Sequence, residues 1–197
     1  PVTAGMDGVP GRPDPLTARY VLETLKIAAE GCMRREYAAM VTAPVHKAVI
    51  NESGYAFSGH TEFLGGICSV TRPVMMLADK TLRVALVTTH LPLSAVSRAI
   101  TTEHLTDVIN VTGHDLRTRF GITDPRLLVC GLNPHAGEEG YLGREEIEII
   151  IPALDHLRRN GVHITGPVPA DTAFTPERLA LTDVVITMFH DQGLPVL

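Results

Sequence analysis

Short apolar runs alternate with longer amphipathic segments along the chain, which is the pattern of an α/β fold. The short runs contain four to six residues and are rich in β-branched or other apolar side chains, as buried strands are. We therefore predict strands over Ala38–Thr42, Val74–Leu77, Arg83–Thr88, Arg126–Cys130 and Asp183–Met188.

The longer segments have the spacing of amphipathic helices. In the segment that begins at Glu103, four apolar residues and Thr112 recur at i, i+3, i+4, i+7 and i+11, with Thr112 at i+7, so that one helix face belongs to the core. The predicted helices are Leu16–Glu30, which ends at Gly31, Leu93–Thr101, Glu103–Arg119, which ends near Gly121, and Arg144–Asn160, which ends at Gly161.

The last predicted helix has clear signals at both ends. Glu145, Glu146 and Glu148 crowd its start and two arginines lie at its end, which is the arrangement that the helix dipole favours. Gly161 occupies the position where a helix ends in the left-handed conformation. Pro152 lacks an amide hydrogen, so we expect it to bend or restart this helix.

Composition narrows the class of protein. The chain has 197 residues and a mean hydropathy of +0.14, which suits one domain or a two-lobed piece with a real core. A net charge of -5 argues against a nucleic-acid groove or an anionic membrane surface as partner. Three cysteines make no disulfide framework, and no apolar run approaches the ~20 residues of a bilayer span. We expect a soluble, cytoplasmic protein.

Three histidines follow predicted strands, namely His90, His135 and His190. Ligands collect at the carboxyl ends of strands in open α/β sheets, and neutral imidazole suits a borderline divalent ion. The spacings of 45 and 55 residues match no local metal motif, so the predicted metal site rests on topology. Glu138 and Asp191 lie close in sequence to two of the histidines and could accept their second N–H. The alternative is that each histidine only caps a strand.

A second candidate site lies in the segment Ser58–Phe63. Gly59 permits a close backbone approach, and His60, Thr61 and free amides at a helix start would hold a phosphate or a carboxylate. The alternative is a plain helix N-terminus that Thr61 caps.

Familiar catalytic and nucleotide-binding motifs do not occur in the sequence. It contains neither the Gly-x-Gly-x-x-Gly fingerprint nor a Gly-Lys-Ser/Thr loop, which disfavours Rossmann and P-loop nucleotide sites. Gly-x-Ser-x-Gly is also missing, so a serine triad is a poor hypothesis.

Six strings carry a resemblance to a known family, and they occur in the family's order over nearly the full chain. They are Thr42–Lys47, Gly59–Phe63, Thr88–Leu93, Gly131–Glu138, Pro169–Thr172 and His190–Pro195. The chain resembles the 4-hydroxythreonine-4-phosphate dehydrogenases of pyridoxal phosphate (vitamin B6) biosynthesis.

The resemblance implies a homodimeric, two-lobed, three-layer α/β/α fold like that of isocitrate and isopropylmalate dehydrogenases, which bind NAD without the glycine fingerprint. Residues 1–197 would be the central part of such an enzyme, incomplete at both ends, with lobe boundaries that the sequence does not resolve. By the same resemblance, His90, His135 and His190 match divalent-metal ligands shared across the dimer interface, and His60 and Thr61 match substrate-binding residues.

The resemblance also implies the chemistry. Zinc, magnesium or cobalt would assist NAD or NADP in oxidising the secondary alcohol of 4-phosphooxy-L-threonine. The product is a β-keto acid that decarboxylates to 3-amino-2-oxopropyl phosphate. Asp171 and Asp191 match acidic residues near the reacting centre, where one takes the proton or only orients a ligand histidine. The cofactor-binding residues stay unassigned.

Three alternatives stay open. One is a related dehydrogenase that acts on phosphothreonate or a dihydrodiol, and another is a hydrolase or lyase in which three histidines hold a metal. The third is a non-catalytic binding or assembly fragment. Members of the resembled family continue beyond the position of Leu197 with further substrate-binding residues, so we expect a chain that ends there to bind metal without turnover.

Overall fold

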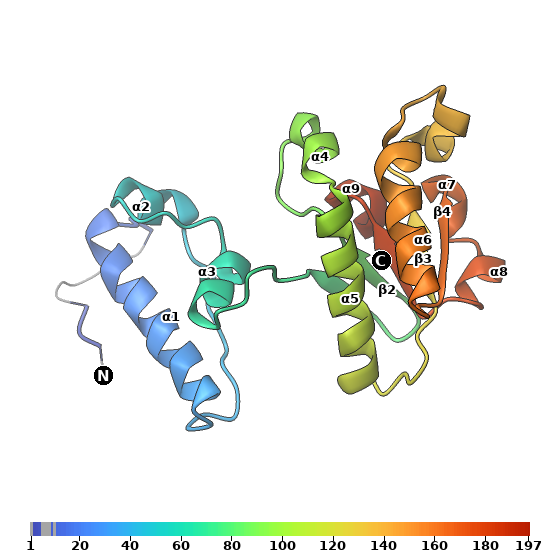
Figure 1. Ribbon diagram of the computed structural model, residues 1–197. Helices are drawn as coiled ribbons and strands as arrows, with labels where there is room; N and C mark the ends of the chain where they lie inside the picture. Colours follow the sequence, from blue (N-terminus) through green and yellow to red (C-terminus); the bar gives the residue numbers. More distant parts are fainter. Residues whose placement is uncertain (1, 5–8, 10) are drawn as a thin grey trace. The chain divides into compact units, whose positions relative to one another are not determined.

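The computed structural model describes residues 2–4, 9 and 11–197 of the chain (Figure 1). The chain divides into two compact units, Pro1–Pro73 and Val74–Leu197. The N-terminal unit is built from helices, and the C-terminal unit carries a sheet. Over the described residues, no helix combines the length and the apolarity that crossing a membrane requires.

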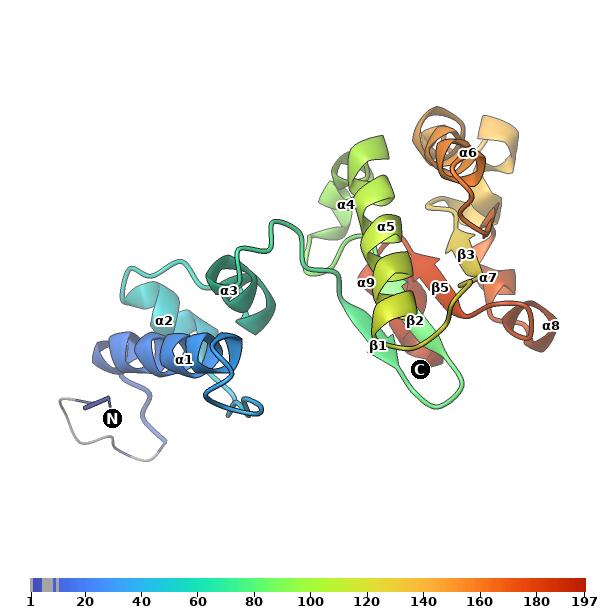
Figure 2. The ribbon, with the colours of Figure 1, turned by 60° about the horizontal axis from the view of Figure 1, so that its bottom comes forward.

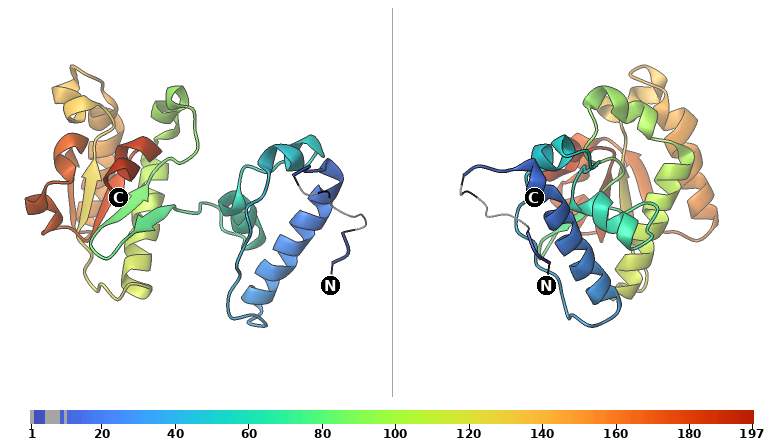
Figure 3. Two further views of the ribbon diagram at one scale, coloured as in Figure 1. Left: turned by 180° about the vertical axis from the view of Figure 1, so that it is seen from behind. Right: turned by 90° about the vertical axis from the view of Figure 1, so that its left-hand side faces the viewer.

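The N-terminal unit packs three helices around a small apolar core (Figure 3). They are α1 (Ala18–Met33), α2 (Lys47–Glu52) and α3 (His60–Ile67). The predicted helix from Leu16 is confirmed, but it runs past Gly31 to Met33; the ring of Tyr37 packs against this glycine, where a side chain would collide with it. The core contains Ala18, Leu25, Ile50 and Phe57.

The predicted strand over Ala38–Thr42 is wrong. These residues form irregular chain, and the side chain of Val41 is 97% exposed. An apolar run forms a strand only where another strand pairs with it, and no strand does so here among the described residues, although Met40 packs on the core of the unit.

The C-terminal unit is built on a five-stranded sheet in the order β1-β2-β5-β3-β4. The strands are β1 (Met76–Ala78), β2 (Arg83–Leu86), β3 (Leu127–Cys130), β4 (Ile164–Val168) and β5 (Val184–Thr187). Only β1 runs antiparallel, because the short turn at Asp79 joins it to β2 directly. The other pairs are parallel, with Ala85 opposite Ile186 and Val129 opposite the same residue.

Four of the five strands correspond to predicted ones, whereas β4 was not predicted. Its sequence Ile164-Thr-Gly-Pro-Val168 interrupts the apolar run with glycine and proline, which weaken strand patterns. As the last strand in the sheet order, β4 pairs on one side only, with β3, so a proline is tolerated there.

Helices cover both faces of the sheet, so the predicted α/β fold with a central sheet is confirmed (Figure 2). The helices are α4 (Leu93–Ala99), α5 (Thr102–Thr118), α6 (Ile151–Arg159), α7 (Ala170–Ala173), α8 (Pro176–Leu179) and α9 (His190–Gly193). On one face, α5 and α6 bury Leu105, Ile109 and Leu154 against the sheet. On the other face, Ala173 of α7 and Leu179 of α8 pack on β3 and β5.

Pro152 restarts the fourth predicted helix, as its missing amide hydrogen requires. A π-helical turn over Glu146–Ile150 precedes α6, and Pro152 lies in the first turn of the regular helix that follows. The helix then ends as predicted, with Gly161 at a φ of +82°.

Arg126 and Asp183 fix the amino ends of two neighbouring parallel strands. The guanidinium of Arg126 donates to both carboxylate oxygens of Asp183 at 3.0 Å, and its backbone amide donates to Oδ2 at 2.8 Å. These bonds lower the pKa of Asp183 below its ordinary value of 3.8. The pair therefore sets the register in which β3 and β5 begin.

We predict that Asp183→Asn lowers the free energy of unfolding by about 1 kcal/mol at neutral pH. A carboxyl group whose pKa is lowered by folding stabilises the fold above its unfolded pKa, and this contribution is lost as the pH falls through the folded pKa. The difference from wild type, measured by urea unfolding, should thus begin to shrink as the pH falls below the ordinary value of 3.8, and should vanish only below the lower pKa of the folded state. Glu148→Gln, which breaks an exposed pair with Arg144, should change stability by less than about 0.5 kcal/mol.

The core of α5 supplies a second stability test. Leu105 is fully buried, so Leu105→Ala should cost about 2–5 kcal/mol in thermal or urea unfolding, through lost burial and a cavity. Val111 of the same helix is 39% exposed, and Val111→Ala should cost less than about 0.5 kcal/mol. Equal losses from the two variants would show that α5 does not pack on the sheet through this face.

Candidate active site

Four neighbouring parallel strands lead into the predicted site residues at one edge of the sheet. His90 follows β2, His190 and Asp191 follow β5, His135 follows β3, and Asp171 follows β4 at the start of α7. Because the carboxyl ends of parallel strands meet at one edge, all five residues belong to the same side of the C-terminal unit. The segment that carries Asp171 packs against the loop that carries His135.

His90 and His190 lie close together, with their ring centroids 6.0 Å apart. The strands that lead to them stay paired beyond their ends: the amide of Thr88 donates to the carbonyl of Met188 at 3.1 Å, and the Thr88 hydroxyl donates to the same oxygen at 2.7 Å. The Asp191 carboxylate lies 2.7 Å from Nδ1 of His190. An ionised carboxylate only accepts, so this contact places the proton on Nδ1 and leaves Nε2 able to bind an ion.

His135 lies on a loop with an unusual backbone. Every residue from His135 to Gly140 has a positive φ, from 42° to 96°. Four of these residues are not glycine, and each costs about 1–2 kcal/mol in the left-handed region. Such strain persists only where surrounding contacts hold it, and it concentrates at functional sites.

A buried carboxylate lies under this loop. Glu146 is 2% exposed, and its Oε1 accepts from the amides of Leu132 and Asn133 at 2.7 and 2.8 Å. Its Oε2 accepts from the side chain of Asn133 at 2.9 Å. The neighbouring Glu145 accepts from Ser97 and from Asn133, and these two bonds lower the pKa of Glu145. The start of the loop is therefore bonded to Glu145 and Glu146 at the start of the π turn, and Glu145 is bonded in turn to Ser97 of α4.

Gln192 joins the loop that carries His190 to the loop that leads to His135. Its Oε1 accepts from the amide of Met188 at 2.7 Å, and its Nε2 donates to the carbonyl of Gly131 at 2.7 Å. Both partners lie directly after strands, β5 and β3 respectively. One side chain thus sets the spacing between the two strand ends.

A pocket of about 280 Å³ lies beside His190. Apolar side chains of Leu91, Leu93, Val96 and Phe189 form most of its wall. Its polar members include His190 and Asp191, so the two predicted site residues face a cavity of the size that a small metabolite fills.

His60 and Thr61 lie in the N-terminal unit, in the first turn of α3. Thr61 does not cap the helix, because the cap position belongs to Gly59 and no side chain bonds to the free amides. Nε2 of His60 is buried and has no hydrogen-bond partner among the residues that the structure describes, and the rings of His60 and Phe57 meet edge to face with their centroids 6.0 Å apart. A side chain on Gly59 would come within 3.1 Å of Glu62 Oε2, the end of a flexible side chain.

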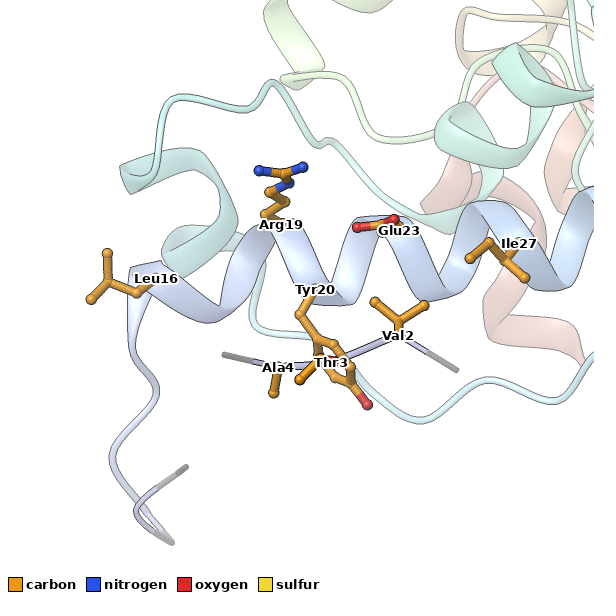
Figure 4. Close-up of a pocket in the computed structure, with 8 residues that line it drawn as sticks. All are labelled: Val2, Thr3, Ala4, Leu16, Arg19, Tyr20, Glu23 and Ile27. Carbon is orange, nitrogen blue, oxygen red and sulfur yellow. The ribbon is translucent and has the colours of Figure 1, made fainter. Parts of the chain in front are cut away.

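Another pocket of the N-terminal unit lies along α1 and contains none of the predicted site residues. Figure 4 shows Arg19, Tyr20, Glu23 and Ile27 of this helix lining it, together with residues near the start of the chain. It therefore offers no support for the predicted chemistry.

The structure brings some of the predicted metal ligands together and not all. His90 and His190 are neighbours, but no group of three or more metal-ligating side chains occurs among residues 2–4, 9 and 11–197 of a single chain. The site that would unite His135 with these two histidines across a dimer stays a prediction.

Comparison with known proteins identifies the family. The family described as "Pyridoxal phosphate biosynthetic protein PdxA" matches residues 2–197. The chain belongs to this family. It is 61% identical over 189 residues to a 4-hydroxythreonine-4-phosphate dehydrogenase of Marinobacter nauticus, covering 96% of this chain and 56% of that protein. The predicted resemblance is therefore confirmed.

Solved structures agree with the PdxA assignment. The crystal structure of 4-hydroxythreonine-4-phosphate dehydrogenase from Klebsiella pneumoniae superposes with a TM-score of 0.88 at 35% identity, over 100% of this chain and 59% of that one. A terephthalate 1,2-cis-dihydrodiol dehydrogenase from Burkholderia xenovorans has a TM-score of 0.67 at 28% identity, over 96% of this chain and 60% of that one. The chain thus spans somewhat more than half the length of each of these proteins.

The sequence does not reveal two residues that hold the loops at the carboxyl edge of the sheet. The sequence indicates only that Glu146 suits the helix dipole, although its carboxylate turns inward, and it gives no separate signal for Gln192 beside His190. The sequence offers one weak signal, the closely spaced glycines Gly131 and Gly137, which indicate a tightly folded loop near a buried group.

We predict that Gln192→Met, which keeps the length of the side chain, destabilises this PdxA chain by about 1–3 kcal/mol in urea unfolding. The substitution leaves the amide of Met188 and the carbonyl of Gly131 without their partner. Asp191→Ala is the matched control, because its side chain is 85% exposed, and it should cost less than about 0.5 kcal/mol. A Gln192→Met protein as stable as wild type would show that the two loops hold their spacing without this bridge.

Proposed function

We propose that the protein oxidises the secondary alcohol of 4-phosphooxy-L-threonine with NAD or NADP, as a step of pyridoxal phosphate biosynthesis. The observation that carries the proposal is the 61% identity, over nearly the whole chain, to a protein named 4-hydroxythreonine-4-phosphate dehydrogenase. The gathering of His90, His190, His135 and two aspartates along one sheet edge supports it, because ligands collect at such edges.

We propose His90, His135 and His190 as the ligands of a zinc, magnesium or cobalt ion. The donor set fits a divalent ion, since two of the imidazoles are neighbours and His190 has an oxygen partner on its other nitrogen, as ligand histidines usually do. The ion, when bound, would polarise the substrate hydroxyl as a Lewis acid, and the nicotinamide would accept the hydride.

The residues of this chain would orient the substrate and move a proton. Asp191 holds the tautomer of His190, and the exposed carboxylate of Asp171, beside the His135 loop, is the candidate to take the proton of the hydroxyl. His60 and Thr61, at the start of α3, would bind the substrate; a polar group of the substrate would supply the partner that the buried Nε2 of His60 lacks among the described residues.

The proposed assembly and location follow the same family expectation. A homodimer would bring a second set of histidines to the metal site. The cytoplasm is the proposed compartment, which agrees with three cysteines that stay unpaired in the described structure.

The decisive test is an assay of the purified protein with whatever flanking sequence its gene encodes. Reduced nicotinamide is followed by absorbance with 4-phosphooxy-L-threonine, NAD or NADP, and zinc, magnesium or cobalt. We expect turnover that chelation abolishes, and a loss of at least about 100-fold in kcat/KM for His135→Ala. His163→Ala is the control, because this exposed histidine precedes β4 at the opposite edge of the sheet. Turnover that survives His135→Ala unchanged would contradict the proposal.

A second candidate function is oxidation of a cyclic cis-dihydrodiol. The observation that favours this function is the similarity to the Burkholderia xenovorans terephthalate dihydrodiol dehydrogenase, at a TM-score of 0.67. Assaying a terephthalate dihydrodiol and 4-phosphothreonate in parallel with 4-phosphooxy-L-threonine separates these substrates, and the highest kcat/KM identifies the natural class.

A further inference from the structure

We propose that Glu146 is a positioning residue for His135, because its buried carboxylate holds the loop that presents this imidazole. The inference rests on the proposed role of His135 as a metal ligand. It concerns a group that does not touch the ion or the substrate and acts only through the loop backbone.

The carboxylate of Glu146 is the anchor to which the start of the loop is bonded. Two successive backbone amides, those of Leu132 and Asn133, donate to one oxygen at 2.7 and 2.8 Å, and the Asn133 side chain donates to the other at 2.9 Å. A carboxylate that is 2% exposed has to find such donors, because burying a charge without partners is very unfavourable. The bonds therefore form together with the fold of the loop.

The loop wraps around this carboxylate on both sides of His135. A side chain on Gly131 would lie 2.9 Å from Oε1 of Glu146, and one on Gly137 would lie 2.6 Å from Oε2. Only glycine lets the backbone come so close at both points. His135 lies between these two contacts, in the left-handed region at a φ of 52°. The direction of its side chain is thus set by a backbone that the carboxylate holds at two places.

The other two acids at the start of this helix do not share the role. Glu148 is exposed and pairs with Arg144 one turn away, as an acid that only suits the helix dipole does. Glu145 bonds to Ser97 and to the Asn133 side chain but to no loop amide. Glu146 and Glu148 are therefore a matched pair of variants with the same change of charge.

The test compares Glu146→Gln with Glu148→Gln in the purified protein by two measurements. The first is amide hydrogen exchange at Leu132 and Asn133, and the second is the affinity for Co²⁺ from calorimetry and from the absorption bands of the bound ion. In Glu146→Gln, one oxygen becomes an NH₂ group that faces the NH₂ group of Asn133. We expect exchange at least about tenfold faster at both amides and Co²⁺ binding about 10–100-fold weaker with altered absorption bands. Glu148→Gln should stay within about twofold of wild type in both.

These readouts separate positioning from a structural role. A carboxylate that only stabilises the fold would lower the unfolding temperature and leave the Co²⁺ affinity and spectrum of the folded protein unchanged, and that result would overturn the proposal. If Glu146→Gln does not fold, Asn133→Ala replaces it. This variant keeps both backbone bonds and removes the third, together with the bond from Asn133 to Glu145, so Co²⁺ affinity should fall by a smaller factor; unchanged affinity would count against the inference.

A His135→Ala variant distinguishes a failure of this inference from a failure of the proposed function. If it binds Co²⁺ as tightly as wild type, His135 is not a ligand and the proposed metal site is wrong. The proposal that Glu146 positions a metal ligand is then wrong as well, even if amide exchange shows that the Glu146 carboxylate holds the loop. If His135→Ala abolishes Co²⁺ binding and Glu146→Gln does not weaken it, the metal site stands and only the positioning role is wrong.

Discussion

Parallel pairing of β2, β5, β3 and β4 is the constraint on which the candidate active site depends. Strands that run the same way end at the same edge, and the residues that follow them are brought together whatever their separation in sequence. The backbone amide and the hydroxyl of Thr88, which both bond to the carbonyl of Met188, carry this pairing past the strand ends, and so does the side chain of Gln192 between Met188 and Gly131. Without that register, His90 and His190 would not be neighbours.

The loop that carries His135 at this edge of the sheet has an unfavourable backbone conformation. Groups outside the proposed reacting centre stabilise it. A run of left-handed residues that includes His135 is unfavourable by itself. The buried carboxylate of Glu146 offsets that cost with three hydrogen bonds, and Asn133 links it to Glu145. Strain at a functional loop and a fully bonded charge beneath it are two parts of the same arrangement.

Periodicity predicted the helices well and the strands less evenly. The helix from Glu103 and the end of the fourth helix at Gly161 follow from local spacing and end signals, which act within one or two turns. The strand predicted at Ala38–Thr42 does not form, and β4 forms although it was not predicted. Both errors have the same cause, because a segment becomes a strand only when another strand pairs with it. Gly166 and Pro167 hid a strand that β3 holds in place.

The sequence by itself determined the fold class, the family and the kinds of side chain that follow each strand, because these depend on composition, short-range spacing and motif order. Only the tertiary structure decided that His90 and His190 face each other and that Glu146 turns inward while Glu148 stays in water. The physical reason is that acids in the first turn of a helix look alike in the sequence, since each suits the helix dipole. Which of them is buried depends on a loop that folds back from a different strand.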